Sequence, residues 1–181
     1  MSGTTEETLK LKFLFDQYKN FVEWYKQAES KSFFVHALNG GLIGLVNLLV
    51  VFGIIPHYSL TIIFSSLIIS LTAGVVCLIL SYYFLLSSVR GRHHIKDLKQ
   101  LKKHRIWFFG DVQEHSADEW ERNLTDIDIF QIESTMISQN HILAGNLNEK
   151  FQLINRAIHW TVGALISFLL FGISSFYLKI I

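Results

Sequence analysis

The stretch from Ser32 to Val89 reads SFFVHALNGGLIGLVNLLVVFGIIPHYSLTIIFSSLIISLTAGVVCLILSYYFLLSSV, and its 58 residues include no Asp, Glu, Lys or Arg. A second uncharged stretch, of 22 residues, runs from Ala157 to Leu178. A helix needs roughly 20 consecutive apolar residues to cross the hydrocarbon core of a bilayer. The long stretch has room for two such helices and the short one for a third. The sequence therefore predicts an all-α membrane protein rather than a simple soluble domain.

The predicted transmembrane helices cover about 33–55, 60–86 and 158–178. Only the four residues from Pro56 to Ser59 separate the first two, so these helices must form an antiparallel hairpin with a tight turn. On these bounds the chain has four parts. They are a cytoplasmic amphipathic helix (1–31), a transmembrane hairpin (32–89), a cytoplasmic sensing segment with a helical stalk (90–157) and a third transmembrane helix (158–181).

The positive charges predict the orientation of these helices. Five Lys or Arg residues precede the first predicted span, ten lie between the second and the third, and the hairpin turn has none. Because cytoplasmic loops carry the excess of Lys and Arg, we expect the N-terminus and residues 90–157 in the cytoplasm and the C-terminus outside. The net charge is only +1, which gives no concentrated basic face and no reason to expect a nucleic-acid partner.

One long helix is expected to join the cytoplasm to the third span. Ser116 and Glu119 make a capping-box pattern for a short helix, and Asp126 or Asp128 can cap the next one. From Ile129 onward no proline interrupts the chain. The apolar stripe of this stalk consists of Ile132, Met136, Leu143, Leu147, Phe151 and Ile154. Such a stalk can pass a cytoplasmic event to a transmembrane helix.

Polar and small residues inside the first predicted span suggest assembly. Asn39 and Asn47 are eight residues apart, and an amide in hydrocarbon is costly without a partner. We expect their face to contact another helix or subunit, or to line water. Gly40 and Gly44 are four residues apart, a spacing that lets helices approach closely. These four residues are the candidates for membrane assembly or for a pore.

The sequence contains no motif that supports catalysis or a cofactor. It lacks a glycine-rich phosphate loop, a cysteine pair, a His-Glu-x-x-His motif and a Gly-x-Ser-x-Gly motif. A zinc site can be drawn from His93, His94, Asp97 and His104, but adjacent histidines point to different helix faces. The carboxylates between Asp118 and Asp128 suit helix N-termini better than a metal. We expect neither enzyme activity nor a metal.

Three segments resemble the Pycsar transmembrane effectors in their order, spacing and three-span layout. They are Glu23-Trp24 with Ala28-Glu29-Ser30-Lys31 and Ala37-Leu38-Asn39-Gly40, then Phe108-Phe109-Gly110-Asp111, and finally 139–156 with Lys150-Phe151 leading into the last span. The first segment departs from that family in having Glu where an Asp-x-Lys motif is commoner. The resemblance covers nearly the whole chain.

The resemblance implies a bacterial antiphage role. In such systems a partner cyclase makes cyclic UMP or cyclic CMP on infection, and the effector binds it in the cytoplasm. The effector then impairs the inner membrane, which leads to abortive infection. We therefore expect the lipid bilayer, a cyclic pyrimidine nucleotide and further copies of this chain as partners, with the nucleotide as a regulatory ligand rather than a cofactor.

A cyclic mononucleotide needs a cation for its phosphate, an aromatic plate for its base and amides for the edge of the pyrimidine. The candidates for the cation are Lys150, Arg156, Arg90 and Arg92. Trp107, Phe108 and Phe109 are candidate plates, and Asp111 in the same segment is a further candidate ligand-binding residue. Gln139, Asn140 and Asn146 are candidate edge readers. Two alternatives remain open: a membrane-disrupting effector gated by a cyclic oligonucleotide, and an ungated channel or structural membrane protein.

Overall fold

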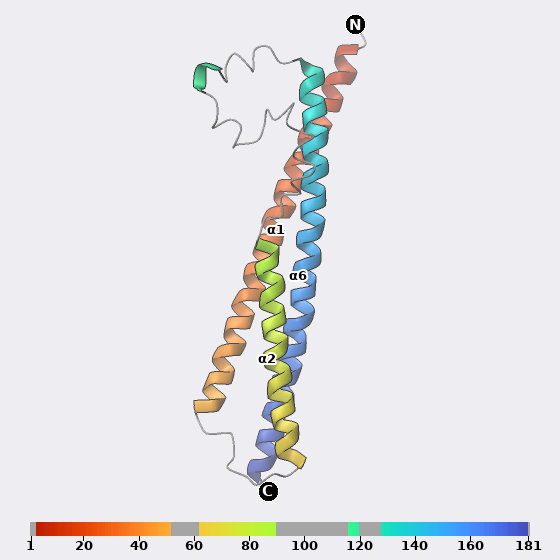
Figure 1. The fold of residues 1–181 in the computed structure, drawn as a ribbon. Coiled ribbons are helices and arrows are strands. Elements are labelled where there is room, and N and C mark those ends of the chain that lie inside the picture. Colours follow the sequence, from red (N-terminus) through yellow and green to blue (C-terminus); the bar gives the residue numbers. More distant parts are fainter. Residues whose placement is uncertain (1–2, 52–61, 90–115, 120–127, 181) are drawn as a thin grey trace. The chain divides into compact units, whose positions relative to one another are not determined.

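The computed structural model describes the backbone of residues 3–51, 62–89, 116–119 and 128–180 (Figure 1). Its long helices are α1 (Gly3–Val51), α2 (Ile62–Val89) and α6 (Ile129–Ile180), and a single helical turn follows Ser116. The prediction of an all-helical chain is confirmed for the described residues. The chain divides into two compact units.

Unit 1 comprises 1–26 and 91–148, and unit 2 comprises 27–90 and 149–181. Helices α1 and α6 contribute residues to both units, whereas α2 belongs to unit 2. In unit 1 the described contacts join α1 to α6: Lys10 forms an ion pair with Glu133, and Leu14 and Met136 are buried. The predicted cytoplasmic helix (1–31) does not end before the predicted first span, because no Gly or Pro interrupts α1 between Thr4 and Asn39.

Unit 2 is a bundle of three helices. Val35 packs with Leu85 and Ala157, and Leu42 packs with Leu78 and with the ring of Phe168. Moving along α1 from Val35 to Leu42, the partners on α2 move backward from Leu85 to Leu78, so these two helices run antiparallel. Figure 1 shows α2 lying beside α1 and α6 within this unit. The predicted antiparallel arrangement of the first two apolar helices is therefore correct.

The buried residues of each helix recur at alternating intervals of three and four. On α6 the series is Met136, Asn140, Leu147, Lys150, Ile154, Ala157, Thr161, Ala164, Phe168, Phe171 and Ser175, and Thr135 beside Met136 is also buried. On α1 the same spacing joins Ala28, Ser32, Val35, Asn39 and Leu42, and on α2 it joins Gly74, Leu78, Ser81, Leu85 and Ser88. A repeat of 3.5 residues is the mark of coiled-coil packing. We call the line of buried positions along each helix the seam. Several seam positions hold polar residues, among them Asn39, Asn140 and Lys150.

The start of α6 and the helical turn before it follow the predicted caps. Ser116 and Glu119 exchange hydrogen bonds between their side chains and backbone amides, at 3.1 and 3.3 Å. The carbonyl of Asp128 accepts from the amides of Gln131 and Ile132. Helix α6 then runs from Ile129 to Ile180 without a break, which confirms the prediction of one helix that continues into the third apolar stretch.

Among the described residues, two helices are long and apolar enough to cross a membrane, rather than the three that the sequence predicts. These candidate spans are Ser65–Val89 and Ile129–Phe176. The predicted first span, 33–55, is not one of these two. Its apolar end beyond Leu48 lies outside the described side chains, and its described part carries the polar residues His36, Asn39 and Asn47. Only 22% and 28% of the most apolar windows of the two candidate spans are buried, so most of their apolar surface faces outward.

Candidate functional site

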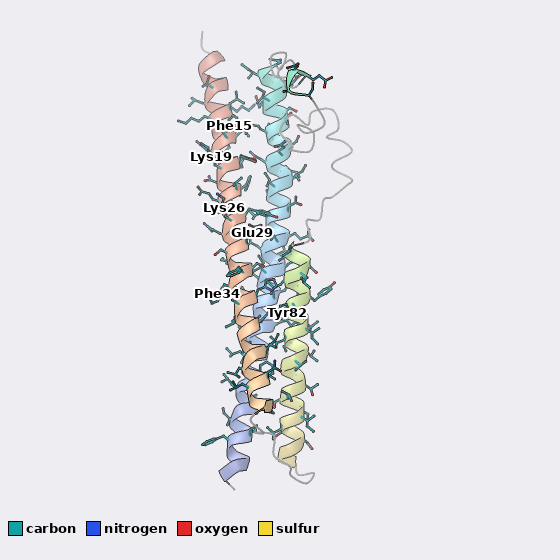
Figure 2. All side chains as sticks on the ribbon, turned by 90° about the vertical axis from the view of Figure 1, so that its left-hand side faces the viewer. Phe15, Lys19, Lys26, Glu29, Phe34 and Tyr82 are labelled. Atoms are coloured by element: carbon teal, nitrogen blue, oxygen red, sulfur yellow. The ribbon has the colours of Figure 1, made fainter. Side chains whose placement is uncertain are left out.

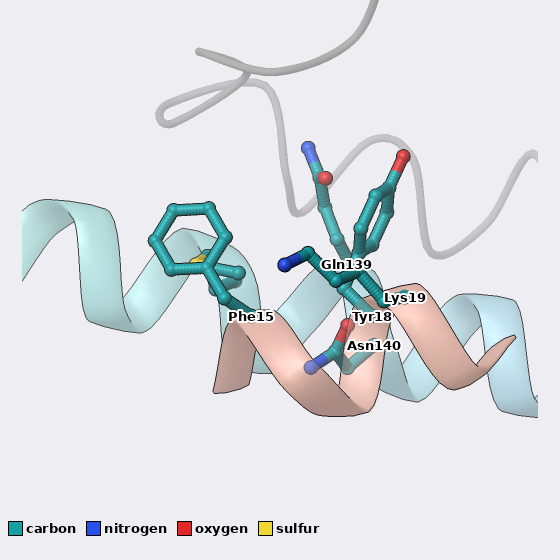
Figure 3. A pocket seen from close by; sticks show the side chains of 6 residues that line it. Phe15, Tyr18, Lys19, Gln139 and Asn140 are labelled. Atoms are coloured by element: carbon teal, nitrogen blue, oxygen red, sulfur yellow. The ribbon is translucent and has the colours of Figure 1, made fainter. Parts of the chain in front are cut away.

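A cavity of about 250 Å³ lies between α1 and α6 in unit 1 (Figure 3). Helix α1 contributes Phe15, Tyr18 and Lys19, and helix α6 contributes Met136, Gln139 and Asn140. Figure 2 marks Phe15 and Lys19 on this part of α1. The lining thus contains two aromatic rings, one ammonium group and two amides.

The heptad pattern explains why these side chains meet. Leu14, Met136 and Asn140 are buried in the seam of unit 1. Phe15 and Lys19 are exposed residues that flank the seam on α1, and Tyr18, four residues after Leu14, is an exposed residue at a seam position. A side chain at such a flanking position covers the edge of the seam. Because the polar Asn140 replaces an apolar residue in the seam, the cavity has a polar group at its base.

Asn140 is held in one orientation. Its Nδ2 donates to the carbonyl of Leu14 at 3.1 Å and to Oε1 of Gln17 at 3.2 Å. Its Oδ1 is buried and has no hydrogen-bond partner among the described residues. In Figure 3 the amide oxygen points to the side where Tyr18, Lys19 and Gln139 lie, and the nitrogen points away. The cavity therefore has a fixed hydrogen-bond acceptor next to a cation and two aromatic rings.

A second polar feature, in unit 2, is a cluster of three hydrogen-bonded side chains from three helices that can close into a ring. Nδ2 of Asn39 donates to Oγ of Ser81 at 2.8 Å, and Oγ1 of Thr161 donates to Oδ1 of Asn39 at 2.9 Å. The two hydroxyl oxygens lie 2.8 Å apart. The carbonyl of Ala157 is a further acceptor for the hydroxyls of Ser81, at 3.1 Å, and Thr161, at 3.0 Å. If Ser81 donates to Thr161, each side chain donates one bond and accepts one bond within the ring. All three are buried, and we call them the polar triad.

A family model, PycTM, described as the Pycsar effector protein domain, matches residues 13–178. The chain belongs to this family. The match spans residues of both units, including the cavity lining and the polar triad. No curated protein and no solved structure matches the chain.

The structure pairs two of the segments that carried the resemblance to the Pycsar effectors. Nζ of Lys150 lies 3.2 Å from Oε1 of Glu29, and Nζ of Lys31 lies 5.3 Å from the ring centre of Phe151. Lys150 occupies a seam position and its side chain is only 8% exposed, whereas that of Glu29 is 61% exposed. The two segments therefore form reciprocal helix contacts in unit 2 of this Pycsar effector.

Of the predicted ligand residues, Gln139 and Asn140 line the cavity. Asn146 is half-buried in unit 1 but is not among the lining residues. Lys150 and Arg156 belong to unit 2, where the guanidinium of Arg156 lies 5.9 Å from the ring centre of Phe84. Arg90, Arg92, Trp107, Phe108, Phe109 and Asp111 lie outside the described residues. Their roles, like that of Lys150 toward a phosphate, stay predictions.

Phe15, Tyr18, Lys19 and Met136 were not predicted as partners of these amides. The amphipathic helix predicted within 1–31 has no local sequence signal that names the residues of α6 opposite it. The available signal was the seam itself, because Leu14 and Asn140 continue the heptad series of their helices.

No group of three or more His, Cys, Asp or Glu residues in the described parts of the chain is arranged to hold a metal.

The structure separates the residues that we expected to act together in membrane assembly. Asn39 is fully buried in the polar triad, whereas Asn47 is exposed, so the two amides do not share one environment. Eight residues correspond to about 80° around a helix, which is enough to move Asn47 out of the seam. A Cβ atom placed on Gly40 or Gly44 would meet no atom within 4 Å. Among the described residues, therefore, these glycines do not mediate a close helix contact.

Proposed function

We propose that this Pycsar effector binds a cyclic pyrimidine mononucleotide, cyclic UMP or cyclic CMP, in the cavity of unit 1. As a homo-oligomer in the bacterial inner membrane it then impairs that membrane and causes abortive infection. The observation that carries the proposal is the family match over 13–178. A partner cyclase supplies the nucleotide, and the chain itself performs no catalysis.

The cavity supports this ligand class by its chemistry. Lys19 offers a positive charge for a phosphodiester that carries one negative charge, and Phe15 and Tyr18 offer flat apolar surfaces for a base. Gln139 and Asn140 supply amide groups for the polar edge of a pyrimidine. Its volume of about 250 Å³ is below the usual range for ligand pockets, which favours a mononucleotide over a cyclic oligonucleotide.

The apolar exterior of unit 2 supports a membrane location. Large hydrophobic side chains are exposed on α2 and on the second part of α6, among them Ile69, Ile79, Leu169 and Ile173. A soluble protein rarely exposes so many large apolar residues together, whereas lipid tails solvate them. We propose three spans, about 33–55, 60–86 and 158–178, with the N-terminus and residues 90–157 in the cytoplasm and the C-terminus outside.

Coupling follows from the helices that the two units share. Helices α1 and α6 line the cavity in unit 1, and both also supply residues to unit 2. A ligand shifts a conformational equilibrium only if it binds one arrangement more tightly than another. The nucleotide must therefore favour one arrangement of α1 against α6 in unit 1.

The test is calorimetric titration of the full chain in detergent with cyclic UMP, cyclic CMP and a cyclic dinucleotide. We expect micromolar or tighter binding of at least one mononucleotide and weaker binding of the dinucleotide. Membrane potential is then measured in cells that express the chain with and without a pyrimidine cyclase. Depolarisation only with the cyclase supports gating, whereas depolarisation without it, or absence of binding, contradicts the proposal.

A further inference from the structure

The orientation of the Asn140 amide is determined by its surroundings. The main-chain carbonyl of Leu14 can only accept a hydrogen bond, so the group that faces it at 3.1 Å must be the Nδ2 donor. Oε1 of Gln17 accepts from the same nitrogen at 3.2 Å. The remaining atom of the amide, Oδ1, can only accept. The base of the cavity therefore presents an acceptor, because rotating the Asn140 amide would lose its bond to the Leu14 carbonyl.

This acceptor is buried and unmatched among the described residues, which is an unfavourable state for a polar atom. Asn140 as a whole is only 4% exposed. Tyr18 and Lys19, which lie on the same side as the oxygen in Figure 3, are exposed side chains of α1 and can change rotamer. A ligand that displaces them and presents an N–H group to Oδ1 would satisfy the atom.

We propose that Asn140 selects the ligand by hydrogen-bond polarity, its Oδ1 accepting a bond from an N–H group on the base-pairing edge of a pyrimidine. The inference rests on the proposed function, because it takes this cavity to be the nucleotide site. Two pyrimidines share the required chemistry: uracil carries the donor at N3, and cytosine carries it in the exocyclic N4 amine. In both cases the ring lies against Phe15 or Tyr18 and the phosphate lies toward Lys19.

A ring without this N–H leaves the acceptor buried and unpaired in the complex. Sites built to hydrogen-bond a polar group discriminate strongly against analogues that lack it, because their own polar atom then has no partner. We expect loss of the single N–H to weaken binding by about tenfold to a hundredfold. Methylation of N3 in cyclic UMP, or double methylation of N4 in cyclic CMP, removes the donor and keeps the phosphate and ribose.

The experiment titrates the wild-type chain in detergent with cyclic UMP, cyclic CMP, N3-methyl cyclic UMP and N4,N4-dimethyl cyclic CMP. The parent nucleotide that binds identifies the base, and its methylated analogue is expected to bind at least about tenfold more weakly. Equal affinity for parent and analogue overturns the inference and leaves the proposed function standing. Absence of binding by both parents overturns both.

A variant provides the second readout. Asn140→Leu removes the acceptor and places an apolar residue in a seam position, where it should fold at least as well as Asn140. Its affinity for the parent nucleotide should fall by about tenfold to a hundredfold, and it should no longer distinguish the parent from its methylated analogue. The matched control is Asn148→Leu, an exposed asparagine of the same unit that does not line the cavity. A folded Asn140→Leu protein, judged by its helical circular dichroism, that binds like wild type overturns the inference.

Discussion

The amide nitrogen of Asn39 on α1 lies 2.8 Å from the hydroxyl oxygen of Ser81 on α2, and both side chains are fully buried. Forty-two residues separate them in the chain. Inside an apolar bundle an amide and a hydroxyl cannot form hydrogen bonds with water. The helix register that brings the two groups together is therefore more stable than registers that separate them. We therefore expect the polar triad to favour one alignment of the three helices of unit 2, as a buried asparagine does in coiled coils.

Replacing Ser81 with Ala should destabilise unit 2, because the amide of Asn39 loses its acceptor and the hydroxyl of Thr161 loses a neighbour at 2.8 Å. We expect a loss of about 1–2 kcal/mol, since polar contacts between membrane helices contribute this much or less. The measurement is the free energy of unfolding in mixed micelles. Ser87→Ala is the matched control, because the hydroxyl of Ser87, in the described part of the chain, donates to the carbonyl of Tyr83 on its own helix. Equal stability of the two variants would show that the triad does not hold the register.

The ion pair between Lys150 and Glu29 should respond unequally to removal of its two members. Lys150→Met places an apolar side chain at a buried seam position and removes a buried charge, so stability should be unchanged or higher. Glu29→Gln leaves the buried ammonium without this carboxylate and should cost about 1 kcal/mol, a modest loss because Glu29 is 61% exposed.

Thermal unfolding in detergent measures both changes. Glu23→Gln, an exposed acid earlier on α1, serves as the control for loss of one negative charge. A larger loss with Lys150→Met than with Glu29→Gln would mean that the ammonium itself holds unit 2 together.

The helices of the described residues were largely predictable because the length of an uncharged stretch and the residues that cap a helix are both local signals. The uncharged stretches located α2 and the end of α6, and Ser116 with Glu119 marked a helix start. The candidate site was harder to predict from the sequence. Asn140 and Lys150 looked like parts of a polar helix face, and only the heptad spacing to Met136 and Ile154 places them in the seam. The partners from α1 cannot be identified without knowing which turn of α1 lies opposite.

Gly74 lies so close to the ring of Phe168 that a larger residue would not fit. The sequence around Gly74 does not reveal this contact. A Cβ atom on Gly74 would lie 2.5 Å from Cε1 of Phe168, and Phe168 is itself only 3% exposed, so its ring has little room to move. Gly74→Ala should therefore destabilise unit 2 by about 1–3 kcal/mol through overpacking. Gly41→Ala is the control, because a Cβ there meets nothing within 4 Å and alanine favours the helix by about 1 kcal/mol. Chemical denaturation that ranks Gly74→Ala at or above wild type would contradict this packing.

The predicted homo-oligomer can be tested on the open glycine face of α1. Gly40, Gly44 and the exposed Asn47 lie within about 60° of one another around the helix, and nothing in the described protomer covers the two glycines. Such a face lets a second helix approach closely in a membrane, and a leucine there holds it away. Gly44→Leu should shift the protein toward monomer in light scattering of detergent complexes, with its unfolding midpoint unchanged. Gly172→Leu on α6 is matched to it, since a Cβ at Gly172 also meets nothing within 4 Å. If both leucine variants keep the wild-type mass, copies of the chain meet elsewhere; if Gly172→Leu alone dissociates, α6 rather than α1 carries the contact.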